Sequence, residues 1–315
     1  MPESSVQRPE LSIVIPVYSE ESHLKQSLLT IRDALDSLDK SYELVIIDDG
    51  SIDNTWDIVV ESSEMFPIFR AVRLSRNFGK ERALSAGIEK ARGDAVIIMD
   101  SDLQHPPQLI AKMVHLWRET GADIVEGIKA DRGKESFINR FQAKFFYFIF
   151  NKLSGFNLYG SSDFKLLDRR VVDAWLKLTE RSLFFRGLIA WLGFKHVQMP
   201  FRVADRAEGP SRWSTLRLLN LSIDALISFS SSLLRIIIVI GGIFLLFALV
   251  LGVQTFSYWA MGRAVSGFAT VIILLLIIGS FIMISLGIIG EYIAKIYEEV
   301  KERPRYVVAE TLDKN

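Results

Sequence analysis

The chain has no cysteine among its 315 residues. This absence excludes disulfide bonds, a thiolate nucleophile and cysteine-ligated zinc. Histidine is scarce as well, since only four are present and none has the spacing of metal ligands: His23, His105, His115 and His196. The 37 basic side chains equal the 37 acidic ones, and no basic stretch is interleaved with aromatics. We therefore expect no nucleic-acid partner.

Charge is nearly missing from one part of the chain. Between Ile236 and Gly290 the only charged side chain is Arg263, which separates two uncharged runs of 27 residues. Each run exceeds the roughly 20 apolar residues that cross a bilayer as a helix. Tyr258 and Trp259 lie near Arg263, and all three residue types favour the membrane interface. These features predict two transmembrane helices, joined as a hairpin, within residues 235–291.

Basic side chains near the membrane lie mainly on the side of the two long ends of this hairpin. They are Arg212, Arg217, Arg235, Lys295, Lys301, Arg303 and Arg305. The positive-inside rule places that side in the cytoplasm, and residues 1–10 do not resemble a signal peptide. We therefore expect an integral protein of the inner or plasma membrane, with the soluble region and both termini cytoplasmic, and residues 292–315 as a cytosolic tail.

Two further segments have the pattern of amphipathic helices. Residues 213–234 mix leucine, isoleucine and phenylalanine with serine, Asn220 and Asp224, and residues 137–150 are rich in aromatics. Helices of this kind lie in the plane of the membrane interface. Packing against a soluble core explains the pattern equally well.

The first 212 residues alternate between strand and helix patterns. Short apolar runs bounded by turn residues predict strands at 11–17, 43–47, 70–74, 95–99 and 123–127. Helical periodicity occupies 21–37, 54–63, 80–91 and 107–120. This order is typical of an α/β fold in which crossover helices connect parallel strands. Such sheets bind ligands at the carboxyl ends of their strands.

Acidic side chains follow two of these predicted strands. Asp48 and Asp49 end the second strand, where two consecutive carboxylates need hydrogen-bond donors such as those of a ribose or a base. Ser51 or Asp53, just beyond, has a simpler explanation as the cap of the next helix.

After the fourth strand come Asp100, Asp102 and Gln104, spaced two residues apart. Oxygen ligands at this spacing suit a hard cation such as Mg²⁺ or Mn²⁺. The alternative for this triplet is a solvated turn.

Six segments, in order and followed by the predicted hairpin, resemble one enzyme family over nearly the whole chain. They are IVIPVYSE (13–20), VIIDDGSIDNT (45–55), RNFGKERAL (76–84), GDAVIIMDSDLQHPP (93–107), GSSDFKLLDRRVV (160–172) and FFRGLIAWLGF (184–194). The resemblance is to the membrane-anchored, inverting polyprenyl-phosphate glycosyltransferases related to dolichyl-phosphate mannose synthase. Within them, the bacterial undecaprenyl-phosphate glucosyltransferases of O-antigen modification are the most similar.

The resemblance implies a GT-A nucleotide-sugar transferase domain over residues 1–212. It implies nucleotide-sugar binding by Pro16, Tyr18, Glu20, Asp48, Asp49 and Asp100, and a cation held by Asp100, Asp102 and Gln104. Arg206 and Arg212 resemble residues of the family's mobile loop that closes over phosphates. Asp163 is the acid expected to face the sugar or the attacking oxygen, as a base or as an orienting group. Its alternative is a structural partner for Arg169 or Lys165.

The acceptor that the resemblance implies is a lipid monophosphate, which is largely dianionic near neutral pH and already nucleophilic. It requires no general base, but it requires cations that offset its repulsion from the donor. The basic residues after the fifth predicted strand are the candidates: Lys129, Arg132, Arg140 and Lys144.

The sequence therefore predicts transfer of a hexose, glucose from UDP-glucose, to a polyprenyl phosphate at the cytoplasmic membrane face. Asp102, Asp163 and Arg206 are the predicted catalytic residues. A different donor, such as GDP-mannose, UDP-GlcNAc or an aminoarabinose nucleotide, is the first alternative. The second is a catalytically degenerate sensor or scaffold. Whether the chain forms a homo-oligomer stays open.

Overall fold

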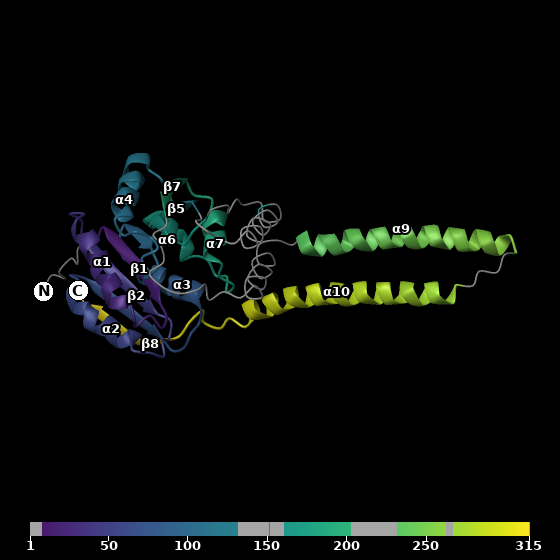
Figure 1. Ribbon diagram of the computed structural model, residues 1–315, viewed down its shortest axis with the longest axis horizontal. Coiled ribbons are helices and arrows are strands. Elements are labelled where there is room, and N and C mark those ends of the chain that lie inside the picture. The colour runs from purple at the N-terminus through teal and green to yellow at the C-terminus, as the bar shows by residue number, and fades with distance from the viewer. Residues whose placement is uncertain (1–7, 132–150, 152–160, 203–231, 263–266, 315) are drawn as a thin grey trace. The chain divides into compact units, whose positions relative to one another are not determined.

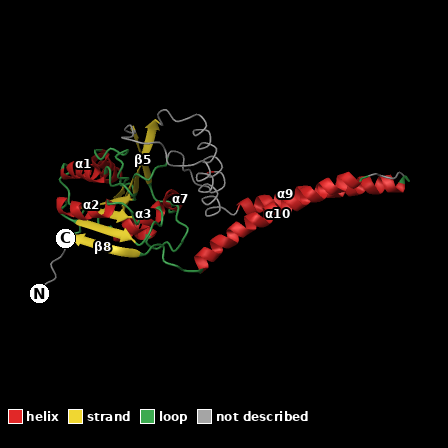
Figure 2. Ribbon diagram, turned by 60° about the horizontal axis from the view of Figure 1, so that its bottom comes forward, coloured by secondary structure: helices red, strands yellow, loops and turns green. Residues whose placement is uncertain are grey.

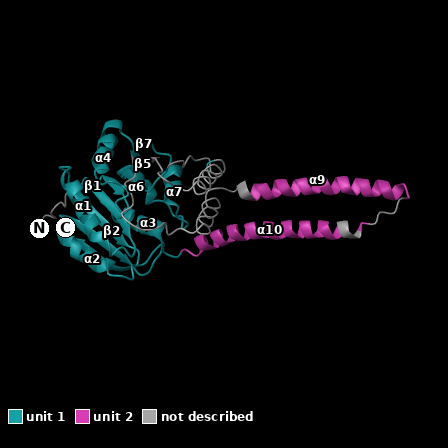
Figure 3. Ribbon diagram, viewed as in Figure 1, with its two compact units in different colours: residues 1–151, 156–213, 303–315 teal, residues 152–155, 214–302 magenta. Residues whose placement is uncertain are grey.

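The computed structural model describes residues 8–131, 151, 161–202, 232–262 and 267–314. The chain divides into two compact units, which Figure 3 shows in different colours. The first unit comprises residues 1–151, 156–213 and 303–315, and the second comprises residues 152–155 and 214–302. Of the residues predicted to bind the donor, those that the structure describes fall in the first unit.

Within its described residues, the first unit contains one eight-stranded sheet of order β7-β5-β6-β4-β1-β2-β3-β8 (Figure 1). The strands are β1 (Leu11–Val17), β2 (Tyr42–Asp48), β3 (Phe69–Leu74), β4 (Ala95–Ile98), β5 (Ile124–Asp131), β6 (Lys165–Asp168), β7 (His196–Arg202) and β8 (Val308–Lys314). The helices are α1 (Leu24–Asp36), α2 (Thr55–Ser62), α3 (Lys80–Lys90), α4 (Leu109–Thr120), α6 (Arg169–Trp175) and α7 (Phe185–Trp191), with a 3₁₀ turn, η1 (Ser63–Met65). The predicted alternation of strands and helices is confirmed.

The sheet is mixed, which corrects the expectation of a parallel one. Parallel pairs join β1 to β2 and β4, β2 to β3, and β5 to β7. However, β6 runs antiparallel to β4 and β5. The strand β8 (Figure 2) runs antiparallel to β3. Antiparallel strands are common additions to large parallel sheets. The carboxyl ends of β1, β2 and β4 still share one edge, where the predicted donor-binding residues begin.

Helices cover both faces of the central strands. On one face, α1, α2 and α4 pack against a core that includes Ile13, Ile15 and Leu44, all fully buried. On the other face, α3 contacts β1 and β2. Every residue of β1 and β2 is consequently buried. A sheet buried on both faces explains why these strands appear in the sequence as continuous apolar runs rather than alternating ones.

The carboxyl-terminal tail contributes a strand to this sheet. Residues Val308–Lys314 pair with β3, with Thr311 opposite Val72 and Glu310 opposite Arg73. The sequence predicted only a charged cytosolic tail at 292–315. Its first nine residues, 292–300, continue the helix Phe268–Val300, and Ala294 and Lys295 among them are good helix formers.

The second unit contains the two long helices α9 (Ser232–Ala260) and α10 (Phe268–Val300). Of the described residues, Leu234–Ala260 and Val271–Val300 form helices long and apolar enough to cross a membrane. Phe244 and Phe281 pack one helix against the other with ring centroids 5.2 Å apart. The predicted amphipathic segments lie outside the described residues, apart from a few terminal positions.

We expect Gly87→Ala to lower the melting temperature although alanine favours helix by about 1 kcal/mol. A Cβ on Gly87 would overlap Cγ1 of Val14 and lie 3.3 Å from Cγ1 of Ile47. Overpacking of this kind costs about 1–3 kcal/mol. Thermal unfolding of the purified full chain measures the effect. Val14→Ala should partly rescue the variant, and a higher melting temperature for Gly87→Ala alone would contradict this packing.

Candidate active site

The loops that follow β1 and β2 are joined by hydrogen bonds. The backbone N–H of Ser19 donates to Oγ of Ser51 at 2.9 Å, and that of Glu20 donates to Oγ1 of Thr55 at 2.8 Å. The Ser51 hydroxyl donates in turn to the carboxylate of Asp48. These contacts hold the ends of two neighbouring strands together and give this edge of the sheet a fixed shape.

Asp48 and Asp49 both lie at this edge, as predicted, but their surroundings differ. Asp48 is fully buried, and its Oδ2 has no hydrogen-bond partner among the described residues. Burial raises the pKa of Asp48, against the hydrogen bonds from Ser51 and the charge of Arg73. A buried carboxylate oxygen with spare acceptor capacity is suited to a donor group on a ligand.

Asp49 uses its carboxylate within the protein. Its two oxygens accept the backbone N–H groups of Phe78 and Gly79 at 2.7 and 2.8 Å. Burial raises the pKa of Asp49, and the two hydrogen bonds oppose that rise. Gly50 completes the contact, because it has φ = +70° and a Cβ there would overlap the backbone of Arg76. The carboxylate of Asp49 therefore holds the loop that leads into α3.

The loop after β4 brings a third set of acidic groups to the same edge. Asp102 accepts the backbone N–H of Gln104 at 3.0 Å, and the Ser101 hydroxyl donates to the carboxylate of Glu20. Burial, together with the nearby charges of Asp100 and Asp102, raises the pKa of Glu20 to about 7, against the hydrogen bond from Ser101 and the charge of Lys80. Glu20, Asp100 and Asp102 thus form one acidic cluster, in which Glu20, expected at the nucleoside, lies beside the two aspartates expected at the cation.

Lys80, the first residue of α3, links this cluster to Asp163. Its Nζ lies 2.6 Å from Oδ1 of Asp100 and 2.9 Å from Oδ2 of Asp163. Arg186 on α7 binds the same carboxylate through Nε at 2.7 Å and Nη2 at 3.1 Å. Burial alone would raise the pKa of Asp163, but Arg186 and Lys80 hold it well below its usual range. A carboxylate in this state is a weak base, so the geometry favours the orienting role over the basic one.

The alternative partners expected for Asp163 are occupied elsewhere. Lys165 pairs with Glu126 on β5, and Arg169 donates to the backbone carbonyls of Ala91 and Gly93.

Glu81, next to Lys80, accepts the backbone N–H of Phe185 at 2.6 Å, and burial raises the pKa of Glu81 to about 7. This contact joins the start of α3 to the start of α7, the helix that carries Arg186.

The donor set at the acidic cluster fits a hard divalent cation. Asp100 and Asp102 supply carboxylate oxygens and Gln104 an amide oxygen, while the ammonium of Lys80 already binds Asp100. Among the described residues, no three His, Cys, Asp or Glu side chains are grouped closely enough to hold a metal alone. Mg²⁺ is commonly held by one or two carboxylates together with substrate phosphates and water, and two carboxylates suffice for that arrangement.

The remaining predicted residues lie in different places. Pro16 is buried within β1, and Tyr18 follows β1 with 39% of its surface exposed. Lys129 lies in β5, opposite Phe201 of β7. Five predicted basic residues lie outside the described part of the chain: Arg132, Arg140, Lys144, Arg206 and Arg212.

Sequence reasoning did not single out Lys80, Glu81 or Arg186. A signal was present, because Lys80 and Glu81 belong to the segment 76–84 and Arg186 to the segment 184–194, both of which carried the family resemblance. Their partners are distant in the chain, since Lys80 and Asp163 are 83 residues apart. No local spacing links such residues.

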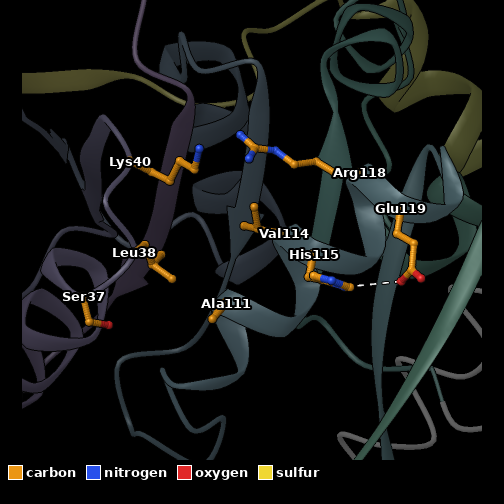
Figure 4. Close-up of a pocket in the computed structure, with 8 residues that line it drawn as sticks. All are labelled: Ser37, Leu38, Lys40, Ala111, Val114, His115, Arg118 and Glu119. Atoms are coloured by element: carbon orange, nitrogen blue, oxygen red, sulfur yellow. Dashed lines mark ion pairs between the residues drawn. The ribbon is translucent and has the colours of Figure 1, made fainter.

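A groove of about 580 Å³ lies elsewhere on the first unit, toward the amino ends of the strands (Figure 4). It is lined by residues of α4 and of the segment after α1, including Lys40 and Arg118, which both pair with Glu10. None of the predicted site residues lines it.

Comparison with known proteins identifies the family. Residues 12–176 match the model of glycosyl transferase family 2. An uncharacterized glycosyltransferase of Synechocystis is 39% identical over 96% of this chain and 95% of its own length. The prophage bactoprenol glucosyl transferase homolog of Escherichia coli K12 is 34% identical, with coverage of 95% and 98%. The bactoprenol glucosyl transferase of Shigella phage SfII is also 34% identical, with coverage of 95% and 97%. The chain therefore belongs to glycosyl transferase family 2.

Proposed function

We propose that this glycosyltransferase transfers glucose from UDP-glucose to undecaprenyl phosphate at the cytoplasmic face of the membrane, with inversion at the anomeric carbon. One observation carries the proposal: the carboxylates of Glu20, Asp100 and Asp102 meet at the edge where α/β sheets bind ligands, and Lys80 connects them to Asp163. The relatives named as bactoprenol glucosyl transferases, aligned over almost the whole chain, support this acceptor and this sugar.

The nucleoside end of the donor is assigned to the joined loops after β1 and β2. Asp48 offers a buried acceptor atom there, and the half-exposed ring of Tyr18 lies at the end of the neighbouring strand. Pro16 and Asp49 act indirectly in this assignment, by shaping the strand end and the loop before α3. Arg206 and Arg212 are proposed to close over the donor phosphates.

The diphosphate is assigned to the acidic cluster. Asp100, Asp102 and Gln104 would hold the divalent cation, which when bound offsets the charge of the donor diphosphate and of the departing nucleotide. Glu20 lies against Ser101, between the two aspartates, and helps to define the shape of this loop. Either Mg²⁺ or Mn²⁺ fits these oxygen donors.

The sugar transfer itself is a single displacement. A phosphate oxygen of the acceptor forms the new bond to the anomeric carbon on the face opposite the diphosphate, whose bond to that carbon breaks with the electron pair leaving on UDP. No proton has to be removed from a dianionic acceptor. Asp163 then serves by holding Lys80 and Arg186, two cations suited to orient anionic groups in the site.

The acceptor phosphate is assigned to the basic residues Lys129, Arg132, Arg140 and Lys144. The apolar helices α9 and α10 support a membrane location, which would keep the site near the headgroups where a prenyl phosphate presents its charge. Membrane attachment is thus part of the proposed mechanism.

Asp102→Ala should abolish transfer, since it removes one of the two carboxylates proposed to bind the cation. The measurement is the incorporation of labelled glucose from UDP-glucose into organic-extractable lipid during a Mg²⁺ or Mn²⁺ titration. Asp57→Ala, an exposed acid on α2, is the matched control and should retain activity. Wild-type rates for Asp102→Ala at saturating metal would contradict the assignment. Labelling from GDP-mannose or UDP-GlcNAc in place of UDP-glucose would reassign the donor.

Asp163→Asn should lower kcat on the order of 100-fold, because the amide keeps the shape of the side chain but loses the charge that holds Lys80 and Arg186. Affinity for UDP should change little, since Asp163 is not assigned to the nucleotide. Steady-state kinetics and UDP titration measure the two effects. Asp168→Asn, at the far end of β6, is the control and should leave kcat intact. A wild-type kcat for Asp163→Asn would remove this role.

A further inference from the structure

The last strand of the chain supplies two carboxylates to arginines of β3. In the sheet register, Glu310 is opposite Arg73 and Asp313 is opposite Arg70. The Arg73 Nη1 lies 3.1 Å from Glu310 Oε1, and the Arg70 Nη1 lies 3.3 Å from Asp313 Oδ1. Each arginine also contacts an acidic residue of β2 on its other side. The sheet edge therefore contains two carboxylate–arginine–carboxylate rows.

The two rows differ in where they end. The row of Arg70 ends on Glu43, near the start of β2, with Nε and Oε2 2.9 Å apart. The row of Arg73 ends on Asp48, the last residue of β2, with Nε and Oδ2 3.4 Å apart. The same guanidinium donates from Nη2 to the carbonyl oxygen of Ser51 at 3.3 Å. Only the row of Arg73 reaches the proposed nucleotide site.

Glu310 is well placed to fix the orientation of Arg73. While Oε1 binds Arg73, Oε2 accepts Nε1–H of Trp56 at 3.1 Å. The guanidinium also lies over the Trp56 ring, 5.8 Å from its centroid. Glu310 and Trp56 thus fix the orientation of the Arg73 guanidinium, whose Nε stays 3.4 Å from Oδ2 of Asp48. This leaves the buried Oδ2 of Asp48 without a hydrogen bond from Arg73.

We propose that Glu310 is a positioning residue for nucleotide binding: it restrains Arg73 so that Asp48 keeps an acceptor atom, and the Ser51 loop its shape, for the nucleoside. This rests on the proposed function, which places the nucleoside at these residues. Without the charge of Glu310, the Arg73 guanidinium moves from its 3.4 Å ion pair with Asp48 to a direct hydrogen bond on Oδ2, which occupies the acceptor atom. The nucleotide site is thus completed by a strand that follows α10 in the chain.

The test compares Glu310→Gln with Asp313→Asn in the full-length protein, using calorimetric titration with UDP and Mn²⁺ and with GDP in parallel. Glutamine keeps an acceptor for Trp56 but removes the charge that restrains Arg73. We expect the Kd for UDP to rise about threefold to tenfold, with a corresponding rise in the KM for the donor and a smaller change in kcat. Asp313→Asn is the matched control, because it breaks the equivalent pair of Arg70 at the other end of β8.

A double-mutant cycle separates positioning from a general loss of the strand. If Glu310 acts through Arg73, Glu310→Gln adds no further change in Kd to Arg73→Met. The inference is overturned if Glu310→Gln binds UDP like wild type. It is also overturned if Asp313→Asn weakens binding equally with the same loss of melting temperature. Failure of the wild-type chain to bind either nucleotide would overturn the proposed function, and this inference with it.

Discussion

The candidate site depends on mutual repulsion among carboxylates at one edge of the sheet. Burial raises the pKa of Glu20, and the nearby charges of Asp100 and Asp102 add to that rise. Asp163, just before β6, is joined to this group through Lys80. Lys80 makes this concentration of negative charge tolerable, because its single ammonium contacts both Asp100 and Asp163. Such an edge attracts cations, together with the anionic compounds that are bound to those cations.

The fold places Lys80 by a sequence of specific contacts. Asp49 accepts two backbone N–H groups from the turn at Phe78 and Gly79, and this turn sets where α3 begins. Glu81 then binds the backbone of Phe185, so the same helix start also positions α7 and Arg186. Asp49, which the sequence suggested for nucleotide binding, thus makes its hydrogen bonds within the protein. Strand ends and helix starts together define the site.

The sequence revealed the parts of this molecule that have local signals. Continuous apolar runs predict buried strands. The rule that ligands bind at strand ends directs attention to the polar residues there, and Glu20, Asp48 and Asp100 do lie at one edge of the sheet. Lys80 and Arg186 lie in segments that carried the family resemblance, but no local pattern pointed to either residue, because their role arises from a contact with Asp163 across the fold. The strand β8 was missed for a related reason. Its residues are polar and mostly exposed, so only pairing with β3 identifies them as a strand.

The position of β8 has a consequence for how the protein is made. The sheet takes its central strand from the first twenty residues of the chain and its edge strand from the last ten, with both apolar helices between them in the sequence. During translation, the ribosome releases β8 only after α9 and α10 have emerged. Until then, the backbone of β3 is an unpaired edge, open to association with other nascent chains. A chain that lacks β8 would leave that edge permanently uncovered.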